Sequence, residues 1–279
     1  MPAPERQKAL LTLLADDDDR VYQAIRAELL SGGEKNTGWL REHLLHPDPA
    51  IRRRVREFLT EFDAEKNDNA FILFCLSAGE NLDLEEGVWR FVLTEYPDAN
   101  VGAYQAQLDQ WAAAITERMP ESPTGEDRLR VINEYLYGDL GFRGNGDALS
   151  DPQASYLNRV IDRRQGIPIA MCCIYMFVAR RLGIAMSGIG MPGHFLCRFQ
   201  TAIEEHYVDA FHGGLIMNRA DARKRLAHYN LDNDDRLLMP VSTRRTLQRM
   251  VSNVHLAYKE RNDEVATERL QRHLFALAR

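Results

Sequence analysis

The sequence contains little lysine, no excess of positive charge and no long apolar run. Only five of its 35 basic residues are lysines, and its net charge is -6. A nucleic-acid-binding surface requires a basic face, so we expect no nucleic-acid partner and attribute the arginine richness to genome composition. The longest uncharged apolar run, residues 166–179, is shorter than the about 20 residues that span a bilayer. We therefore expect a buried helix there and no membrane partner.

Cysteine is also scarce. The four cysteines, at positions 75, 172, 173 and 197, show neither the paired spacing of a metal site nor the context of a secreted, disulfide-bonded protein. The first residues contain no apolar run of the secretory kind and continue directly into an amphipathic pattern. We therefore expect a reduced, cytoplasmic protein that carries no metal and no cofactor.

The remaining composition is that of a globular protein: of 279 residues, 45% are apolar and 27% are charged. Through residue 120 the apolar residues recur at helical spacing between turn-forming segments. The turn HPDP at residues 46–49 precedes an amphipathic helix and resembles the turns of HEAT-type helical pairs. At most two such copies are present, whereas a solenoid needs three or more, so an ordinary helical region is the favoured interpretation.

Residues 166–211 indicate one apolar helix followed by two strands. Proline is tolerated in a first helical turn, where its missing N–H would have no partner, so Pro168 is a suitable helix start. From 167 to 179 every side chain is apolar or cysteine, which is typical of a helix packed on all sides. His194 follows a Pro-Gly turn and opens a strand to residue 199, and Asp209 lies in a second strand, 205–211. The buried carboxylate needs a partner, which the ring N–H of His194 is expected to supply.

Five short segments occur in an order that resembles a known family. They are LGFRGN at 140–145, SYLNRV at 155–160, RQGIPI at 164–169, PGHFL at 192–196 and DAFHGG at 209–214. Together they are similar to a bacterial family described as regulators of sirC expression, with a transglutaminase-like domain and often a terminal TPR-like segment. In transglutaminase-like enzymes a Cys at a helix N-terminus attacks a carbonyl, a His takes its proton and an Asp orients the His. The resemblance assigns the last two roles to His194 and Asp209.

The nucleophile of this pattern is missing. Counting back about four turns from the Leu-Gly pair that closes the helix places Pro168 at the position of the catalytic Cys. Cys172 lies on the same helix face as Pro168, but about 6 Å deeper along the axis, away from the helix N-terminal field that lowers a thiol pKa. Cys173 points about 100° away, and Cys197 should face away from His194 on its strand. A buried structural thiol is therefore the favoured interpretation of Cys172.

A metal site is the other arrangement to weigh. Along a strand, Asp209 would face opposite to both His206 and His212, because positions three apart point to opposite sides. His194, Asp209 and His212 could converge only if the chain turns back after residue 210. Zinc requires three or four convergent ligands, so no metal site is predicted.

These observations predict an α+β, predominantly helical protein in three parts. Residues 1–120 form a helical region, HEAT-like as the alternative. Residues 121–240 form a transglutaminase-like, papain-like core with a small antiparallel sheet. Residues 241–279 form a helical hairpin that corresponds to a partial TPR.

Two functions remain open. The favoured one is a non-catalytic or cryptic member that acts as a binding or regulatory module for a peptide-like or small ligand, or for a protein partner. Its degenerate cleft is predicted to hold the ligand beside His194 and Asp209, with four further residues, Arg143, Asn145, Asn158 and His212. The alternative is an amide-directed thiol hydrolase or acyl-transferase, in which Cys172 is a displaced nucleophile, His194 the base and Asp209 the residue that orients it.

Overall fold

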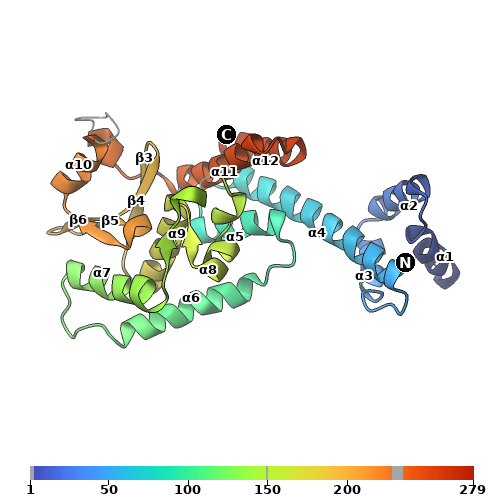
Figure 1. Cartoon of the computed structure of the whole chain (residues 1–279), viewed down its shortest axis with the longest axis horizontal. Helices are drawn as coiled ribbons and strands as arrows, with labels where there is room; N and C mark the ends of the chain where they lie inside the picture. The colour runs from blue at the N-terminus through green and yellow to red at the C-terminus, as the bar shows by residue number, and fades with distance from the viewer. Residues whose placement is uncertain (1–2, 149, 228–234) are drawn as a thin grey trace. The chain divides into compact units, whose positions relative to one another are not determined.

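The computed structural model describes residues 3–148, 150–227 and 235–279 (Figure 1). The chain divides into two compact units. The first contains the residues up to Asn69 together with Leu93–Asp98, and the second contains Ala70–Val92 and Ala99–Arg279. The residues of the sheet and of the C-terminal hairpin share the second unit, and the boundaries expected at residues 120 and 240 stay a prediction. Within the described ranges, no helix has both the length and the apolarity that crossing a membrane requires.

The first unit is helical. It contains α1 (Pro4–Leu14), α2 (Asp19–Ser31), α3 (Glu34–Arg41) and the first part of α4 (Pro49–Ser77). The side chain of Asp18 caps α2 by accepting a hydrogen bond from the Arg20 N–H. The buried core of this unit consists of ten apolar residues, Leu10, Leu11, Leu14, Ile25, Leu29, Trp39, Leu40, Val55, Phe58 and Leu59. The predicted helical content is confirmed, and a HEAT-like arrangement stays a prediction.

The second unit contains the end of α4 and four further helices before the central one. They are α5 (Leu84–Glu95), whose last three residues belong to the first unit, α6 (Val101–Thr116), α7 (Gly125–Asn133) and α8 (Leu157–Arg163). A capping box starts α7, since Thr124 and Asp127 each accept from the other's backbone N–H. The chain continues from α7 into one turn of π-helix, Glu134–Asp139. Such turns are rare and often lie at functional sites.

The centre of this unit is α9 (Pro168–Arg181), whose residues from Pro168 to Ala179 are all buried. It packs against α6, α8 and a four-stranded antiparallel sheet (Figure 1). The strands follow the order of the chain: β3 (Met186–Met191), β4 (His194–Gln200), β5 (Glu205–Asp209) and β6 (Leu215–Met217). The prediction of an enclosed helix against a small antiparallel sheet is therefore confirmed.

The sheet register places His194 and Asp209 near the same end of the sheet. Met191 pairs with His194 across the Pro-Gly turn, where Gly193 has a φ of +69° that favours glycine. Asp209 pairs with Leu215 at the end of β5. The strand expected to reach residue 211 ends at Asp209 instead, because a 3₁₀ turn, η4 (Ala210–His212), follows at once.

The chain ends in the predicted helical hairpin. After α10 (Arg219–Ala227), the helices α11 (Thr243–Glu260) and α12 (Glu264–Leu277) pack against each other. The turn between them contains Asn262 in the left-handed region, at a φ of +55°. Helix α11 also contacts α9 and β3, so the hairpin is part of the second unit. Its likeness to a TPR stays a prediction.

Candidate functional site

Pro168, the residue that the sequence predicts at the nucleophile position, is the first residue of α9. Ile167 precedes it with extended backbone angles and provides no side-chain cap, and Pro168 occupies the N1 position. Proline fits there because a first-turn N–H has no helical partner. Pro168 is buried and has no nucleophilic atom. Pro168 is therefore a suitable first residue for a buried helix, but it provides no thiol.

The cysteines of the core are packed as apolar residues. Cys172 is fully buried, and its thiol donates to the Phe195 carbonyl at 3.4 Å. The Cys197 thiol donates in turn to the Cys172 carbonyl at 3.6 Å. Burial raises the pKa of Cys172 well above its usual value, and the neighbouring Cys197 thiol raises it further. A thiol in these surroundings stays protonated, which disfavours nucleophilic attack.

His194 and Asp209 form a buried pair. The Nε2 atom of His194 lies 2.9 Å from Oδ2 of Asp209, and both side chains are almost entirely enclosed, at 5% and 0% exposure. Burial alone would raise the pKa of Asp209, but hydrogen bonds and positive charge from His194 and His212 outweigh it and lower the pKa. Asp209 is therefore an anion at neutral pH, with its charge compensated by the groups around it.

The turn after β5 and the helix α10 each add one residue to this pair, His212 and Arg225. Asp209 caps η4, because its Oδ1 accepts from the His212 N–H at 3.2 Å. The turn brings Nδ1 of His212 to 2.9 Å from Oδ2 of the same carboxylate. From α10, Arg225 places Nη1 2.7 Å from that oxygen as well. Three cationic or N–H-bearing groups thus surround one carboxylate oxygen.

The position of His212 corrects an expectation from the sequence. Strand alternation would have placed His212 and Asp209 on opposite faces. Alternation does not apply, because the chain leaves the strand at Asp209 and turns back through η4. The donor atoms of His194, Asp209 and His212 consequently all lie within 4.8 Å of one another.

The other predicted cleft residues lie in two places. Arg143 and Gly144 form β1 (Arg143–Gly144), which runs parallel to β2 (Gln165–Gly166), and the Gln165 amide contacts both Arg143 and Asn145. A side chain on Gly144 would meet the Phe211 carbonyl at 2.4 Å, so this loop packs directly against η4. Arg143 and Asn145 therefore belong to a segment beside the His–Asp pair.

Asn158 has a different environment. It is buried on α8, and its Oδ1 has no hydrogen-bond partner among the described residues. In the part of the chain that the structure describes, no hydrogen bond joins Asn158 to Asp209, so its place in a ligand site stays a prediction.

Sequence reasoning missed Arg225 and the π-helical turn. Arg225 lies on a short helix of mixed charge, α10, where no local pattern distinguishes it from a solvated arginine. At the π-helical turn, Asn133 donates to the Gly214 carbonyl at 2.6 Å. The signal that could have indicated this contact is the Gly213–Gly214 pair, since both glycines have positive φ values and Gly214 packs on Asn133 and Tyr137.

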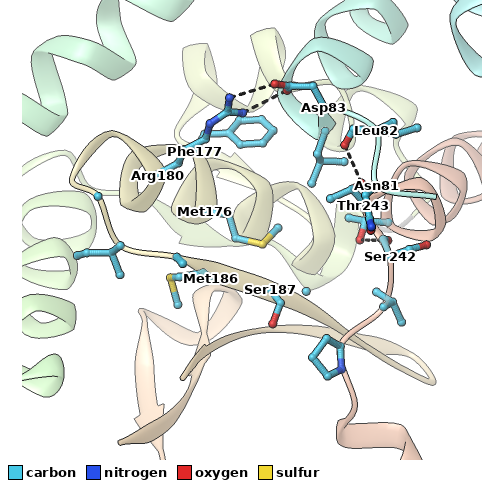
Figure 2. A pocket seen from close by; sticks show the side chains of 18 residues that line it. Asn81, Leu82, Asp83, Met176, Phe177, Arg180, Met186, Ser187, Ser242 and Thr243 are labelled. Carbon is cyan, nitrogen blue, oxygen red and sulfur yellow. Dashed lines mark hydrogen bonds and ion pairs between the residues drawn. The ribbon is translucent and has the colours of Figure 1, made fainter. Parts of the chain in front are cut away.

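A separate pocket lies between the start of α5, the C-terminal half of α9, β3 and the segment before α11 (Figure 2). Its volume of about 770 Å³ is typical of small-molecule sites. Met176 and Met186 line it, and Arg180 and Asp83 form a 3.0 Å ion pair at its border. None of the site residues predicted from the sequence lines this pocket.

A buried helix packed on an antiparallel meander that carries a His–Asp pair is the arrangement of a transglutaminase-like domain. Residues 102–252 match the family described as the transglutaminase-like superfamily, and the chain belongs to that family.

Two kinds of relatives are similar to this chain. The UPF0162 protein of Xylella fastidiosa (strain 9a5c) is 33% identical over 189 residues, which cover 66% of this chain and 67% of that protein. The UPF0162 protein of Xylella fastidiosa (strain Temecula1 / ATCC 700964) is 34% identical, over 64% of this chain and 66% of that protein. F-box only protein 21 of Mus musculus is 32% identical over 134 residues, 45% of this chain and 21% of that protein. No solved structure matches this chain significantly.

Proposed function

We propose that this protein is a non-catalytic or cryptic transglutaminase-like module with a binding or regulatory role in the cytoplasm. It holds a peptide-like or small ligand, or a protein partner, beside His194 and Asp209. The nucleophile position is occupied by Pro168. The role in sirC expression that the resemblance implies belongs to this same proposal.

One observation supports the proposal. The base His194 and the Asp209 that would orient it are present, whereas none of the four cysteines has the surroundings of a reactive thiol. The His194–Asp209 hydrogen bond has a length of 2.9 Å. All four cysteines are buried, and burial raises the pKa of Cys75 to about 12 and the pKa values of Cys172 and Cys173 well above normal. A buried polar pair of this kind can bind a polar ligand without any covalent step.

The relatives support a modular role. In F-box only protein 21 the matched segment accounts for 21% of the protein, so this kind of domain occurs there as one part of a longer chain. A module of that kind can act through binding alone. No observation favours the thiol-enzyme alternative, because the Cys172 sulfur is enclosed and donates to a carbonyl.

Restoring a thiol at the start of α9 tests the assignment of the nucleophile position. We expect Pro168→Cys to create a thiol that iodoacetamide modifies faster at pH 7 than any native cysteine, because a helix N-terminus lowers a thiol pKa. Ile169→Cys is the matched control, one residue further and about 100° around the helix. Peptide mapping by mass spectrometry identifies the modified residue. Equal rates for the two variants would contradict the assignment of residue 168.

Ligand binding is tested separately. N-acetyl amino-acid amides are titrated as peptide-like probes while the ring resonances of His194 and His212 are followed by NMR. We expect saturable shifts for a subset of the amides. Absence of shifts across the panel would contradict a peptide-like ligand, and iodoacetamide modification of Cys172 in the native protein would favour the enzyme instead.

A further inference from the structure

We propose that His194, Asp209 and His212 form a binding site for a divalent transition-metal ion of the zinc class. One donor atom from each of these three side chains lies within 4.8 Å of the other two. The inference rests on the proposed function only in using the same His–Asp pair, and it requires no peptide ligand.

The donor set has the composition of a zinc site with an open position. Two imidazoles and one carboxylate are ligands that zinc prefers, and three protein ligands leave the fourth position to water or to a bound molecule. Softer thiolate ligands do not compete within the folded protein, since all four cysteines are buried. His212 is 51% exposed, so the open position would face solvent on its side.

The backbone holds the three ligands in place before a metal binds. His194 begins β4 directly after the hairpin turn, and Asp209 ends β5 in the same sheet. The cap between Oδ1 of Asp209 and the His212 N–H fixes the turn that carries the third ligand. Because only the side chains need to adjust, binding would require little reorganisation of the main chain.

Metal binding requires the tautomer that leaves a lone pair on each ligating nitrogen. In the structure, Nε2 of His194 and Nδ1 of His212 each lie 2.9 Å from Oδ2 of Asp209, and Nη1 of Arg225 lies 3.4 Å from the same His212 nitrogen. As metal ligands these two nitrogens must offer lone pairs, so in the metal-bound form each ring carries its proton on the other nitrogen. The carboxylate then donates electron density to the metal in place of accepting N–H groups.

Arg225 competes with the metal for the carboxylate. Its Nη1 lies 2.7 Å from Oδ2 of Asp209 and supplies a positive charge there. The side chain is 29% exposed, so it can move toward solvent when a divalent cation takes its place. We therefore expect that removing the Arg225 charge strengthens metal binding, although Arg225 contacts one of the three ligands.

The experiment titrates the chelator-treated full-length protein with Zn²⁺ alone by calorimetry and with Co²⁺ alone by visible absorption. We expect one ion per chain and the intense visible bands of four-coordinate Co²⁺. His212→Ala should weaken binding by about 100-fold, because it removes one of three ligands and even supporting residues typically contribute 10–100-fold. His206→Ala is the matched control, a histidine on β5 that stacks on Phe199 away from the three ligands, and should leave binding unchanged.

Arg225→Gln provides a test in the opposite direction, because it removes the competing ion pair, and we expect it to tighten binding by about 10-fold, or about 1.4 kcal/mol. Absence of stoichiometric Zn²⁺ binding, or binding that survives His212→Ala, would overturn the site. Unchanged or weaker affinity in Arg225→Gln would overturn Asp209 as a ligand. Circular dichroism spectra confirm that each variant is folded. If the amide probes bind while Zn²⁺ does not, the metal site fails and the proposed binding function stands.

Discussion

Arg244 offers the clearest test of how the C-terminal hairpin is held. It lies at the start of α11 with 5% exposure, although nothing in the sequence marks it as buried. Its guanidinium donates to the Cys75 and Ala78 carbonyls at the end of α4, at 2.8 and 2.9 Å. It also donates to the Ala276 and Leu277 carbonyls at the end of α12, at 2.8 and 2.9 Å. One side chain thus satisfies terminal carbonyls of two helices and places positive charge at both negative helix ends.

The expected loss of stability follows from these four hydrogen bonds. Hydrogen bonds to a charged group contribute roughly 1.5–3 kcal/mol each, so four of them give about 6–12 kcal/mol. Burying the guanidinium costs several kcal/mol, which Arg244→Met recovers. We therefore expect Arg244→Met to lower the free energy of unfolding by about 4 kcal/mol. Arg244→Lys should lose about half as much, because a compact ammonium cannot span both helix ends.

Urea denaturation followed by circular dichroism measures the loss, and hydrogen exchange at the α11 and α12 amides locates it. Arg245→Ala is the matched control, since its side chain is exposed, and should cost less than about 0.5 kcal/mol. The amides of α2 report the other compact unit and serve as an internal reference. If Arg244→Met and Arg245→Ala prove equally stable, the reasoning about the helix ends is refuted.

Two further predictions concern the His–Asp site. The contacts of Asp209 lower its pKa, so its contribution to stability is present above the unfolded pKa of about 3.9 and is lost as pH falls through the lower folded value. In Asp209→Asn we expect the free energy of unfolding, measured by urea denaturation, to depend less on pH across this acid range. The same pH dependence as in the unsubstituted protein would contradict the lowered pKa of Asp209. Gly214→Ala should destabilise by about 2 kcal/mol, because φ is +73° and the added Cβ would lie 2.1 Å from Oδ1 of Asn133. Gly79→Ala, which has open space and no positive φ, is its control in thermal melts.

The helices and the order of elements could be predicted because their signals are local. The continuous apolar run after Pro168 predicts an enclosed helix, and the Pro-Gly turn before His194 predicts a strand start. Both agree with the structure, at α9 and at β4. The two stripes of the C-terminal hairpin are equally local, since helical periodicity needs only near neighbours in the chain.

The arrangement around Asp209 could be predicted only in part. Its contact with His194 follows from the need of a buried carboxylate for a partner, and the structure places the two groups at 2.9 Å. The contact with His212 was left open, since it requires the chain to turn back, and alternation along a strand does not reveal where the strand ends. Arg225 was missed for a different reason: its charge is compensated by a residue 16 positions earlier, and no periodicity connects the two.

By itself, the sequence determined the elements, the buried character of α9 and the pairing of His194 with Asp209, since each depends on local pattern or on the chemistry of a single residue. Only the tertiary structure decided that two further residues, His212 from η4 and Arg225 from α10, contact that carboxylate. It also decided that Arg244 lies inside the protein, where it bonds two helix ends. The physical reason is the same in both cases. From the sequence alone, a charged side chain is expected to be solvated. Its burial depends on carbonyls or carboxylates that are distant along the chain and become its neighbours only in the folded protein.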